Sequence, residues 1–509
     1  PKDYKTIPQI LQEAGYTTFN YGKKDYNFHW SSSIYNHKLK NYTDFSKLKE
    51  MQPFFGQIQI KGGKNNTSKL PLNKKVSPDT VNVPLDYPNH ELYKKLVAQH
   101  YDAIRMDDDL IGDILNALKT YELDKNTLVV YFSDHGANNF VRHKQMLSEG
   151  GLHVPLIISG PEKYIPKKTT RDDLVNLIDL SATTLGWAGI KIPSWFEGQD
   201  LFAKNFKERR YIGGHKDRMD HTIDRVRTIR TDEFRYIKNY KLDRILLQPQ
   251  YRDKKDYTQL LHQLYEEEAL SDTHRIIYFG ERKDEELYNV KVDPFMLNDL
   301  SCDPNFNKIL KQHRKLLDEW LSHGDCGMEL ESIYELQVNG EDAKWGIGVN
   351  VEYEKYRIDS DGDGLSDKWE IVNNRDPKDS LLYFEFDCGG WQTEGWYSNN
   401  LSSNIAGPLG YLDFKLDDKF GLIQKNGLNL KINPNSSIKL KISSSEDLEI
   451  MAIINNTIVG KNKIESSKEL KIAELPINIS DRAENLNTLG LQFKGNKGAF
   501  IRIDSIRMH

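Results

Sequence analysis

Cysteine is scarce in this sequence, which holds Cys302, Cys326 and Cys388 in 509 residues. Three cysteines allow at most one disulfide bond, and none stands in the paired spacing of a zinc site. The sequence therefore excludes a disulfide-stabilised mini-protein and a zinc finger. It also has no run of 18 or more apolar residues, so it predicts no membrane-spanning helix.

An excess of one charge is missing as well. The 70 lysines and arginines nearly balance the 75 aspartates and glutamates, which leaves a net charge of -5. No general field draws nucleic acid or an anionic membrane to the chain, and neither is expected as a partner. An anionic ligand would have to be bound by a local group of lysines and arginines.

The length and the order of elements indicate several domains. A chain of 509 residues exceeds what one hydrophobic core usually organises. Residues 1–205 alternate helical and strand-like segments, which predicts an α/β domain with a doubly wound mixed sheet and helices on both faces. We expect residues 127–132 (TLVVYF) to form a fully buried parallel strand of this sheet.

The remainder divides into three parts by pattern. Residues 206–327 combine short strands with an amphipathic helix, which predicts a smaller α+β subdomain. Residues 328–380 form an irregular linker with an acidic run, and residues 381–509 alternate in hydrophobicity as a β-sandwich does. The chain opens on Pro1 without an initiator methionine or a signal peptide, so we expect its numbering to begin within a longer or processed protein.

A polar motif follows the apolar segment at residues 127–132. Asp134 and His135 would lie at the carboxyl end of that strand, where open α/β sheets place their ligands. A carboxylate beside an imidazole is suited to a divalent cation such as Ca²⁺ or Mg²⁺. The alternative, favoured for an isolated Ser-Asp-His-Gly, is that the motif caps a turn and His135 packs locally.

The longer pattern resembles the sulfatase family and outweighs that alternative. It runs from the apolar strand through Ser-Asp-His-Gly to a lysine, a Glu-Gly-Gly segment, Val-Pro-Leu-Ile-Ile and Gly-Pro. Two further segments, TIPQILQEAGYTTFNYGKKDYNF at the start and residues 284–306, resemble family segments in the same order, so the resemblance covers residues 1 to about 325. The matching positions around the central motif are Lys144, Glu149, Gly150, Gly151 and Pro155.

The resemblance implies roles for individual residues. Asp134 and His135 would ligate an active-site Ca²⁺, Lys144 would contact the sulfate and the leaving oxygen, and Lys23 would contact the sulfate and the nucleophile. Asp25 stands where the family usually has a histidine. His143 could serve as the general acid, but a surface histidine is the favoured interpretation, and His143 is not counted among the site residues.

Residues from Gly214 (GHKDRMDHTIDRVRTIRTDEFRYIKNY) resemble the branch that includes heparan N-sulfatases and bacterial polysaccharide sulfatases. This resemblance makes His215, Arg218 and Asp220 candidates for binding the sugar. A surface ion-pair cluster is an equally good interpretation of the same three residues.

Two departures from the family pattern limit what the chain can do alone. The usual histidine motif after the strand near Pro53 is replaced by KGGKNN, which leaves Lys61 or Lys64 as substitutes for contacting substrate. The Cys/Ser-x-Pro/Ala-x-Arg motif that matures to formylglycine is absent, and Cys302 lies in the wrong place to replace it. We expect that modification upstream of Pro1, and no catalysis by these residues alone.

An acidic run at residues 359–370 (DSDGDGLSDKWE) follows the ligand order of an EF-hand loop. Gly364 stands at the sixth position, and without a preceding helix the run resembles the thrombospondin type 3-like calcium linkers of secreted bacterial proteins. The alternative is a solvated acidic linker. The predicted calcium ligands are Asp359, Asp361, Asp363, Asp367 and Glu370.

The tail from about residue 381 resembles bacterial jelly-roll carbohydrate-binding modules. Trp391 and Trp396 are candidates for stacking on sugar rings, and core aromatics are the alternative. Taken together, the resemblances imply an exported sulfuric ester hydrolase, secreted, periplasmic or at the cell surface, acting on a sulfated and possibly algal polysaccharide such as ulvan. Two alternatives stay open: a phosphodiesterase or phosphonate hydrolase of the same alkaline phosphatase superfamily, and a non-catalytic calcium-dependent carbohydrate-binding protein.

Overall fold

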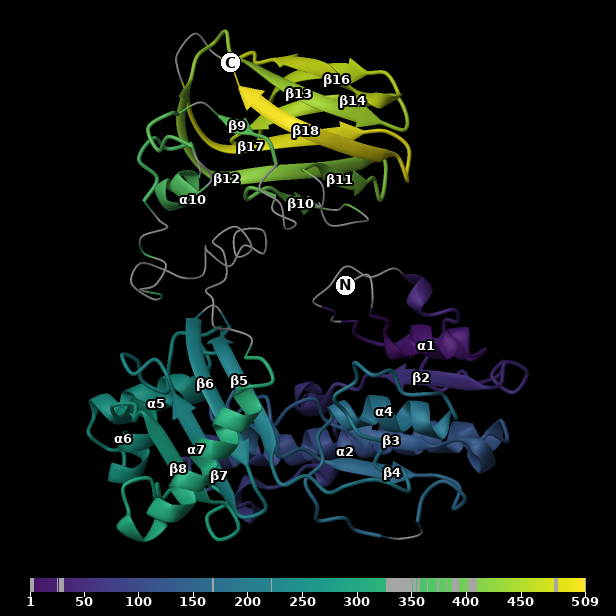
Figure 1. The fold of residues 1–509 in the computed structure, drawn as a ribbon, viewed down its shortest axis with the longest axis vertical. Coiled ribbons are helices and arrows are strands. Elements are labelled where there is room, and N and C mark those ends of the chain that lie inside the picture. The colour runs from purple at the N-terminus through teal and green to yellow at the C-terminus, as the bar shows by residue number, and fades with distance from the viewer. Residues whose placement is uncertain are drawn as a thin grey trace. The chain divides into compact units, whose positions relative to one another are not determined.

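The chain folds into two compact units, residues 1–327 and 328–509 (Figure 1). The division into an α/β domain, a subdomain, a linker and a β-sandwich stays a prediction. The computed structural model describes residues 4–24, 26, 32–166, 169–220, 222–325, 350, 354, 358–363, 365–372, 375–380, 382–386, 393–399, 401, 410–479 and 484–508.

The first unit opens with a helix and two parallel strands. Helix α1 (Ile7–Glu13) begins at Thr6, whose backbone N and side-chain Oγ1 both donate to Gln9 Oε1 at 2.9 Å. Strand β1 (Thr17–Tyr21) pairs in parallel with β2 (Phe54–Ile58). The 30-residue helix α2 (Glu91–Thr120) contributes Leu118 to the cluster that buries Phe19 of β1.

The next two strands differ from the expectation. Strand β3 (Val129–Phe132) pairs antiparallel with β4 (Leu156–Ser159), and Phe132 is 44% exposed, so the prediction of a fully buried parallel strand is wrong. The alternation of helices and strands is confirmed as a mixed α/β fold. Within the described residues, however, the strands form two two-stranded sheets, because β3 pairs with no strand on its other edge.

The remainder of the first unit is a four-stranded antiparallel sheet with helices. Its strands are β5 (Ile212–Met219), β6 (Thr222–Arg230), β7 (Phe234–Asn239) and β8 (Glu285–Asn289), in that order. The last helix packs on this sheet through Leu310, Leu316 and Leu317, which contact Ile229 and Tyr236. The helices after α2 are α3 (Glu149–Leu152), α4 (Ile178–Trp187), α5 (Asp256–Glu266), α6 (Asp272–Phe279) and α7 (Asn307–Leu321).

The second unit holds two antiparallel sheets. One has the order β10-β12-β17-β14-β15 and the other β11-β18-β13-β16, with β9 added beside β18. Phe414 of one sheet contacts Phe493 of the other, with ring centroids 5.3 Å apart. The elements are α10 (Asp367–Val372), β9 (Tyr383–Phe384), β10 (Tyr397–Asn399), β11 (Leu412–Lys415), β12 (Phe420–Ile432), β13 (Ser437–Ser444), β14 (Leu448–Ile454), β15 (Thr457–Ile464), β16 (Ser467–Pro476), β17 (Glu484–Lys494) and β18 (Phe500–Met508).

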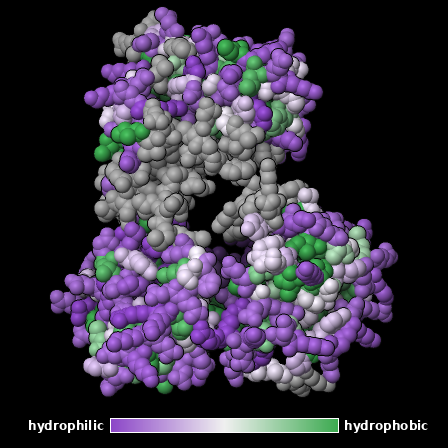
Figure 2. Space-filling model, in the orientation of Figure 1, coloured by the Kyte–Doolittle hydropathy of each residue, from purple (hydrophilic) through white to green (hydrophobic). Residues whose placement is uncertain are grey.

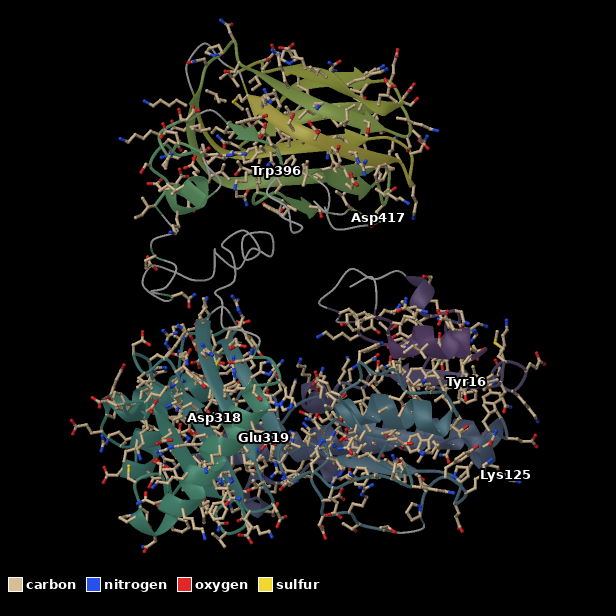
Figure 3. The ribbon with its side chains drawn as sticks, viewed as in Figure 1. Tyr16, Lys125, Asp318, Glu319, Trp396 and Asp417 are labelled. Carbon is tan, nitrogen blue, oxygen red and sulfur yellow. The ribbon has the colours of Figure 1, made fainter. Side chains whose placement is uncertain are left out.

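Trp396 belongs to the core of this second unit (Figure 3). Its side chain is 0% exposed and meets Phe384 edge to face, with centroids 5.5 Å apart. A fully buried indole has no face to offer a sugar, so stacking by Trp396 is ruled out in favour of the core reading. Trp391 lies outside the described residues.

The surfaces of both units are mainly polar in the view of Figure 2. Apolar side chains gather beside α1, where Tyr4 and Trp195 are exposed and their rings meet edge to face at 5.0 Å. In the described part of the chain no helix combines the length and the apolar character needed to cross a bilayer.

Candidate functional site

The carboxylate of Asp134 and the imidazole of His135 lie close together just after the end of β3. His135 Nε2 lies 3.7 Å from Asp134 Oδ1. The other ring nitrogen, Nδ1, lies 2.7 Å from the backbone oxygen of Gly136, and a carbonyl can only accept, so Nδ1 carries the proton. Nε2 is therefore left with its lone pair, which is the arrangement usual for a metal-ligating histidine. These residues fit a divalent cation held between them.

Three glycines explain why this motif is joined to the Glu-Gly-Gly segment. Gly136 N donates to Gly151 O at 3.0 Å, and a Cβ on Gly136 would lie 1.8 Å from Gly150 O. A Cβ on Gly151 would lie 2.1 Å from Met146 O. Because the backbones touch, neither position accepts a side chain without displacing its neighbour. The close contact fixes the Asp134–His135 turn against the start of α3.

Glu149 anchors the same segment to the four-stranded sheet. Its Oε1 accepts from Arg230 Nε at 3.0 Å and from Arg235 Nη2 at 2.6 Å. Burial favours the neutral acid, but the two guanidinium groups outweigh it and lower the pKa of Glu149 below its usual range. Glu149 is therefore an ionised positioning residue that contacts arginines of β6 and β7.

Lys144 lies on the loop between β3 and α3, and a buried arginine holds that loop. Arg252 is 1% exposed, and its guanidinium donates to the backbone oxygens of Asn138 at 3.3 Å, Phe140 at 3.4 Å and Lys144 at 3.2 Å. The ammonium of Lys144 lies 6.0 Å from the centroid of the Tyr251 ring. Sequence reasoning missed Tyr251 and Arg252, because they stand in an irregular segment without a recognisable motif.

His143 is not the surface histidine considered from the sequence. Its ring stacks on Tyr87 at an interplanar angle of 7°, and Tyr87 Oη lies 3.1 Å from Nδ1. Burial first, and then the nearby cations Arg142 and Arg252, lower the pKa of His143 to about 4. The imidazole is therefore neutral near neutral pH, which makes it a poor source of a proton for a leaving group.

The other predicted lysines lie at the ends of β1 and β2. Because these strands are parallel, Lys23 and Lys61 leave the sheet at the same edge. The backbone N of Gln59, two positions before Lys61, donates to Tyr21 O at 2.9 Å, which holds the two strand ends together. Lys64 closes the short 3-10 helix η2 (Gly62–Lys64) that follows. Asp25 lies outside the described residues.

His215, Arg218 and Asp220 come from β5 and the turn after it. His215 is exposed, while Arg218 Nη1 donates to the backbone oxygen of Asp220 at 3.2 Å. Asp220 Oδ2 accepts from the backbone N of Tyr251 at 3.1 Å. The predicted sugar-binding turn is thus joined to the segment that carries Arg252, and through it to the loop of Lys144.

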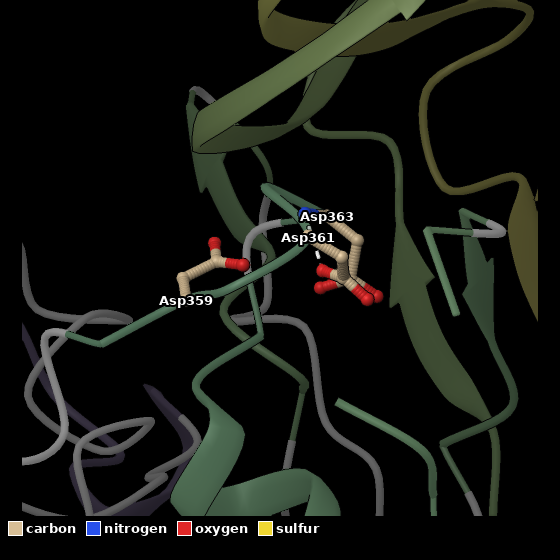
Figure 4. Close-up of side chains that lie close together, drawn as sticks. All are labelled: Asp359, Asp361 and Asp363. Atoms are coloured by element: carbon tan, nitrogen blue, oxygen red, sulfur yellow. Dashed lines mark hydrogen bonds between the residues drawn. The ribbon is translucent and has the colours of Figure 1, made fainter. Parts of the chain in front are cut away.

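A second candidate cation site lies in the linker loop of the second unit (Figure 4). One oxygen from each of Asp359, Asp361 and Asp363 lies within 4.8 Å of the others. Asp361 Oδ2 and Glu370 Oε2 are buried without a hydrogen-bond partner. Buried carboxylate oxygens without partners are costly unless a cation binds them, so the residues fit Ca²⁺. The carboxylate of Asp367 instead accepts a hydrogen bond from the backbone N of Ser360 at 2.7 Å.

The closely spaced carboxylates of this loop also shift one another's pKa values. Burial and the neighbouring carboxylates raise the pKa of Asp363 to about 7 and that of Glu370 to about 8. The backbone N of Asn429 in β12 donates to Gly362 O at 2.8 Å, so the loop is attached to the second unit. Gly364, which would complete the loop, lies outside the described residues.

Comparison with known proteins places these features in a family context. Residues 1–190 match the family model described as Sulfatase, and residues 138–275 match the model described as N-sulphoglucosamine sulphohydrolase, C-terminal. The two matched regions contain the Asp134–His135 turn, Lys144 and Arg252.

Three relatives illustrate the range of similarity. An ulvan-active sulfatase of Formosa agariphila is 28% identical over 416 residues, which cover 73% of this chain and 69% of the relative. A delta 4,5-hexuronate-2-O-sulfatase of Bacteroides thetaiotaomicron is 28% identical over 46% of this chain and 43% of its own length. Human N-sulphoglucosamine sulphohydrolase is 24% identical over 53% of this chain and 57% of its own length. The chain thus spans about half of the last two relatives.

Proposed function

Because this chain belongs to the sulfatase family, we propose that it provides part of the active site for hydrolysing sulfate esters on a sulfated polysaccharide or its oligosaccharides. The ulvan-active relative supports an algal polysaccharide such as ulvan as the substrate. The nucleophile, a formylglycine, has no precursor motif in this sequence and would come from residues outside it.

The two potential metal ligands of the turn, Asp134 and His135, carry this proposal. With Nδ1 occupied by Gly136, His135 Nε2 and the Asp134 carboxylate face one another, and both fit Ca²⁺. A bound Ca²⁺ would supply positive charge for the oxygens of the sulfate group and the nucleophile. The chain's own part is to hold this cation and to keep its ligands fixed through Gly136.

The lysines supply the remaining positive charge. The transition state of sulfate ester cleavage spreads negative charge over the non-bridging and leaving oxygens, so preorganised cations around them lower the barrier. Lys144, on the loop held by Arg252, is assigned to the sulfate and the leaving oxygen. Lys23 is assigned to the sulfate and the nucleophile, with Lys64 or Lys61 beside it at the same sheet edge. His215, Arg218, Asp220 and Asp25 are assigned to the sugar.

The test is sulfate release from ulvan by a protein that carries a formylglycine segment ahead of Pro1. Lys144→Ala is expected to lower kcat/KM by about 100-fold or more, as loss of a charge-stabilising donor does. Lys125→Ala is the matched control (Figure 3). That exposed lysine lies before the amino end of β3, whereas the Asp134–His135 turn follows its carboxyl end. Unchanged release by Lys144→Ala would overturn the assignment. Cleavage of phosphodiesters or phosphonates with no sulfate release would favour the other hydrolases of the superfamily.

For the second unit we propose a β-sandwich that binds carbohydrate and is stiffened at its linker by Ca²⁺ in an extracellular or periplasmic setting. The support is the two antiparallel sheets and the acidic cluster at Asp359, Asp361 and Asp363. Calorimetric titration with Ca²⁺ and glycan-array binding of the whole chain test the two parts of this proposal. Glycan binding without any sulfate release would favour a non-catalytic carbohydrate-binding protein.

A further inference from the structure

One surface segment of the first unit carries only positive charge. Residues 61–78 (KGGKNNTSKLPLNKKVSP), here called the lysine segment, contain five lysines and no aspartate or glutamate. The five lysines are all exposed, in a chain whose net charge is -5. They are Lys61, Lys64, Lys69, Lys74 and Lys75.

None of these five ammonium groups has an ion-pair partner among the described residues. Elsewhere on the same unit, exposed lysines often do: Lys5 lies 2.6 Å from Glu13, and Lys283 lies 2.5 Å from Asp299. Unpaired like charges along one segment repel each other, and this repulsion favours binding of an anion that neutralises several at once.

Two acidic side chains of α2 lie next to the segment, but they bind a backbone N and an asparagine amide and not its lysines. Asp102 of α2 accepts from the backbone N of Val76 at 2.9 Å. Asp107 of α2 accepts from Asn65 Nδ2 at 2.7 Å, and Asn65 Nδ2 also donates to Ala103 O at 3.2 Å. Both carboxylates are buried. They fix the course of the segment without neutralising its lysines.

Further contacts keep the segment ordered although it has no long helix or strand. It contains the short 3-10 helices η2 (Gly62–Lys64), η3 (Thr67–Lys69) and η4 (Leu72–Lys74), and η5 (Pro78–Thr80) begins at its last residue. Asn66 caps η3 by accepting from Ser68 N, and Arg105 of α2 donates to the backbone oxygen of Lys74. Leu70 is buried beneath it. The lysines are therefore presented from a fixed backbone, which reduces the ordering cost of binding.

The segment starts at the proposed sulfate site. It begins where β2 ends, at the sheet edge where β1 delivers Lys23. Lys61 and Lys64 belong to that edge, and Lys69, Lys74 and Lys75 continue along the chain beside α2.

We propose that Lys69, Lys74 and Lys75 form a subsite for sulfate or carboxylate groups of the polysaccharide outside the sugar that reacts. The inference rests on the proposed function, because it takes the substrate to be a sulfated polymer. A chain bearing several anions displaces counterions from all three lysines, so its binding depends strongly on salt.

The test measures binding without turnover, by affinity electrophoresis of the purified chain in gels that contain ulvan. The triple variant Lys69→Gln/Lys74→Gln/Lys75→Gln is expected to bind roughly tenfold more weakly at low salt and to show a shallower salt dependence. The control is Lys308→Gln/Lys311→Gln/Lys315→Gln on α7, which removes three exposed lysines that also have no ion pair among the described residues. The control is expected to bind within about twofold of the unaltered chain.

Chemically desulfated ulvan separates specific from general charge effects, and it is expected to bind more weakly to the unaltered chain. Equal loss of affinity in both triple variants would overturn the proposal, since only net charge would then matter. Unchanged affinity in the segment variant would overturn it as well. Absence of sulfate release by the intact enzyme bears on the proposed function alone, because the binding measurement needs no catalysis.

Discussion

Arg252 and Lys144 stand 108 positions apart in the sequence, yet the guanidinium of Arg252 donates to the backbone oxygen of Lys144 at 3.2 Å. The same group reaches the backbone oxygens of Asn138 and Phe140. Lys144 is therefore positioned by the subdomain segment and not only by its own loop.

Replacing Arg252 with alanine is expected to destabilise the first unit. Three backbone oxygens would lose their buried donor, so we expect the free energy of unfolding to fall by about 2–4 kcal/mol. Urea denaturation followed by circular dichroism measures the change. Arg275→Ala is the control, because Arg275 makes an exposed pair with Asp272 at 3.2 Å, and it should change stability by less than about 0.5 kcal/mol. Similar values for both variants would contradict the role given to Arg252.

Two glycine substitutions test the contact between the Asp134–His135 turn and α3. Gly136→Ala would bring its Cβ to within 1.8 Å of Gly150 O, so we expect a loss of more than about 2 kcal/mol of unfolding free energy. Gly112→Ala places its Cβ in open space inside α2 and is expected to stabilise by about 0.5–1 kcal/mol. The same urea titrations compare the two. A mild effect at Gly136 would mean that the turn is not fixed by this contact.

His143 is expected to titrate well below a free histidine. Its pKa of about 4 in the folded chain lies below the unfolded value, so the unfolded chain binds the extra proton first. This contribution to stability is present above about pH 6.5 and is lost as the pH falls toward 4. NMR titration of the ring, assigned with His143→Gln, measures the midpoint. A midpoint near 6.5 would restore His143 as a candidate proton donor.

The acidic loop of the second unit is expected to make calcium and pH act together. Asp363 and Glu370 have raised pKa values in the folded, calcium-free chain, so the folded state binds more protons than the unfolded state between about pH 4 and 8. Without Ca²⁺, stability should therefore fall as the pH rises through this window.

Scanning calorimetry of the whole chain at pH 5 and pH 8, with EDTA or with Ca²⁺, checks this. We expect Ca²⁺ to raise the Tm more at pH 8, where it no longer competes with protons for the carboxylates. Asp361→Asn is expected to weaken the calcium effect. A calcium shift that is equal at both pH values would contradict the loop as the binding site.

The sequence was sufficient where local patterns determine structure. The alternation of residues such as those of β14 predicted the strands of the second unit. It failed at β3, because an apolar run is equally compatible with a buried centre and with an exposed edge, and neighbouring strands decide between the two.

For the site, the resemblance to sulfatases named Asp134, His135 and Lys144, and their roles stay predictions. Long-range contacts could not be read from the sequence. Arg252 is recognisable only once the segment after β7 is folded against residues 138–145. Likewise, nothing near His143 in sequence indicates that Tyr87 stacks on it.

The contacts of Glu149 also bear on how the parts of the first unit move relative to one another. Glu149 ties α3 to β6 and β7 through two arginines, while Arg252 ties the neighbouring loop to the segment beyond β7. With both connections buried, we expect the sheet of β3, which Asp134 follows, and the sheet of β5, which Asp220 follows, to move together and not as two lobes about a hinge. A polymer would thus dock on a surface that is already shaped for it, and its rate of association would be set by diffusion and charge and not by a closing step.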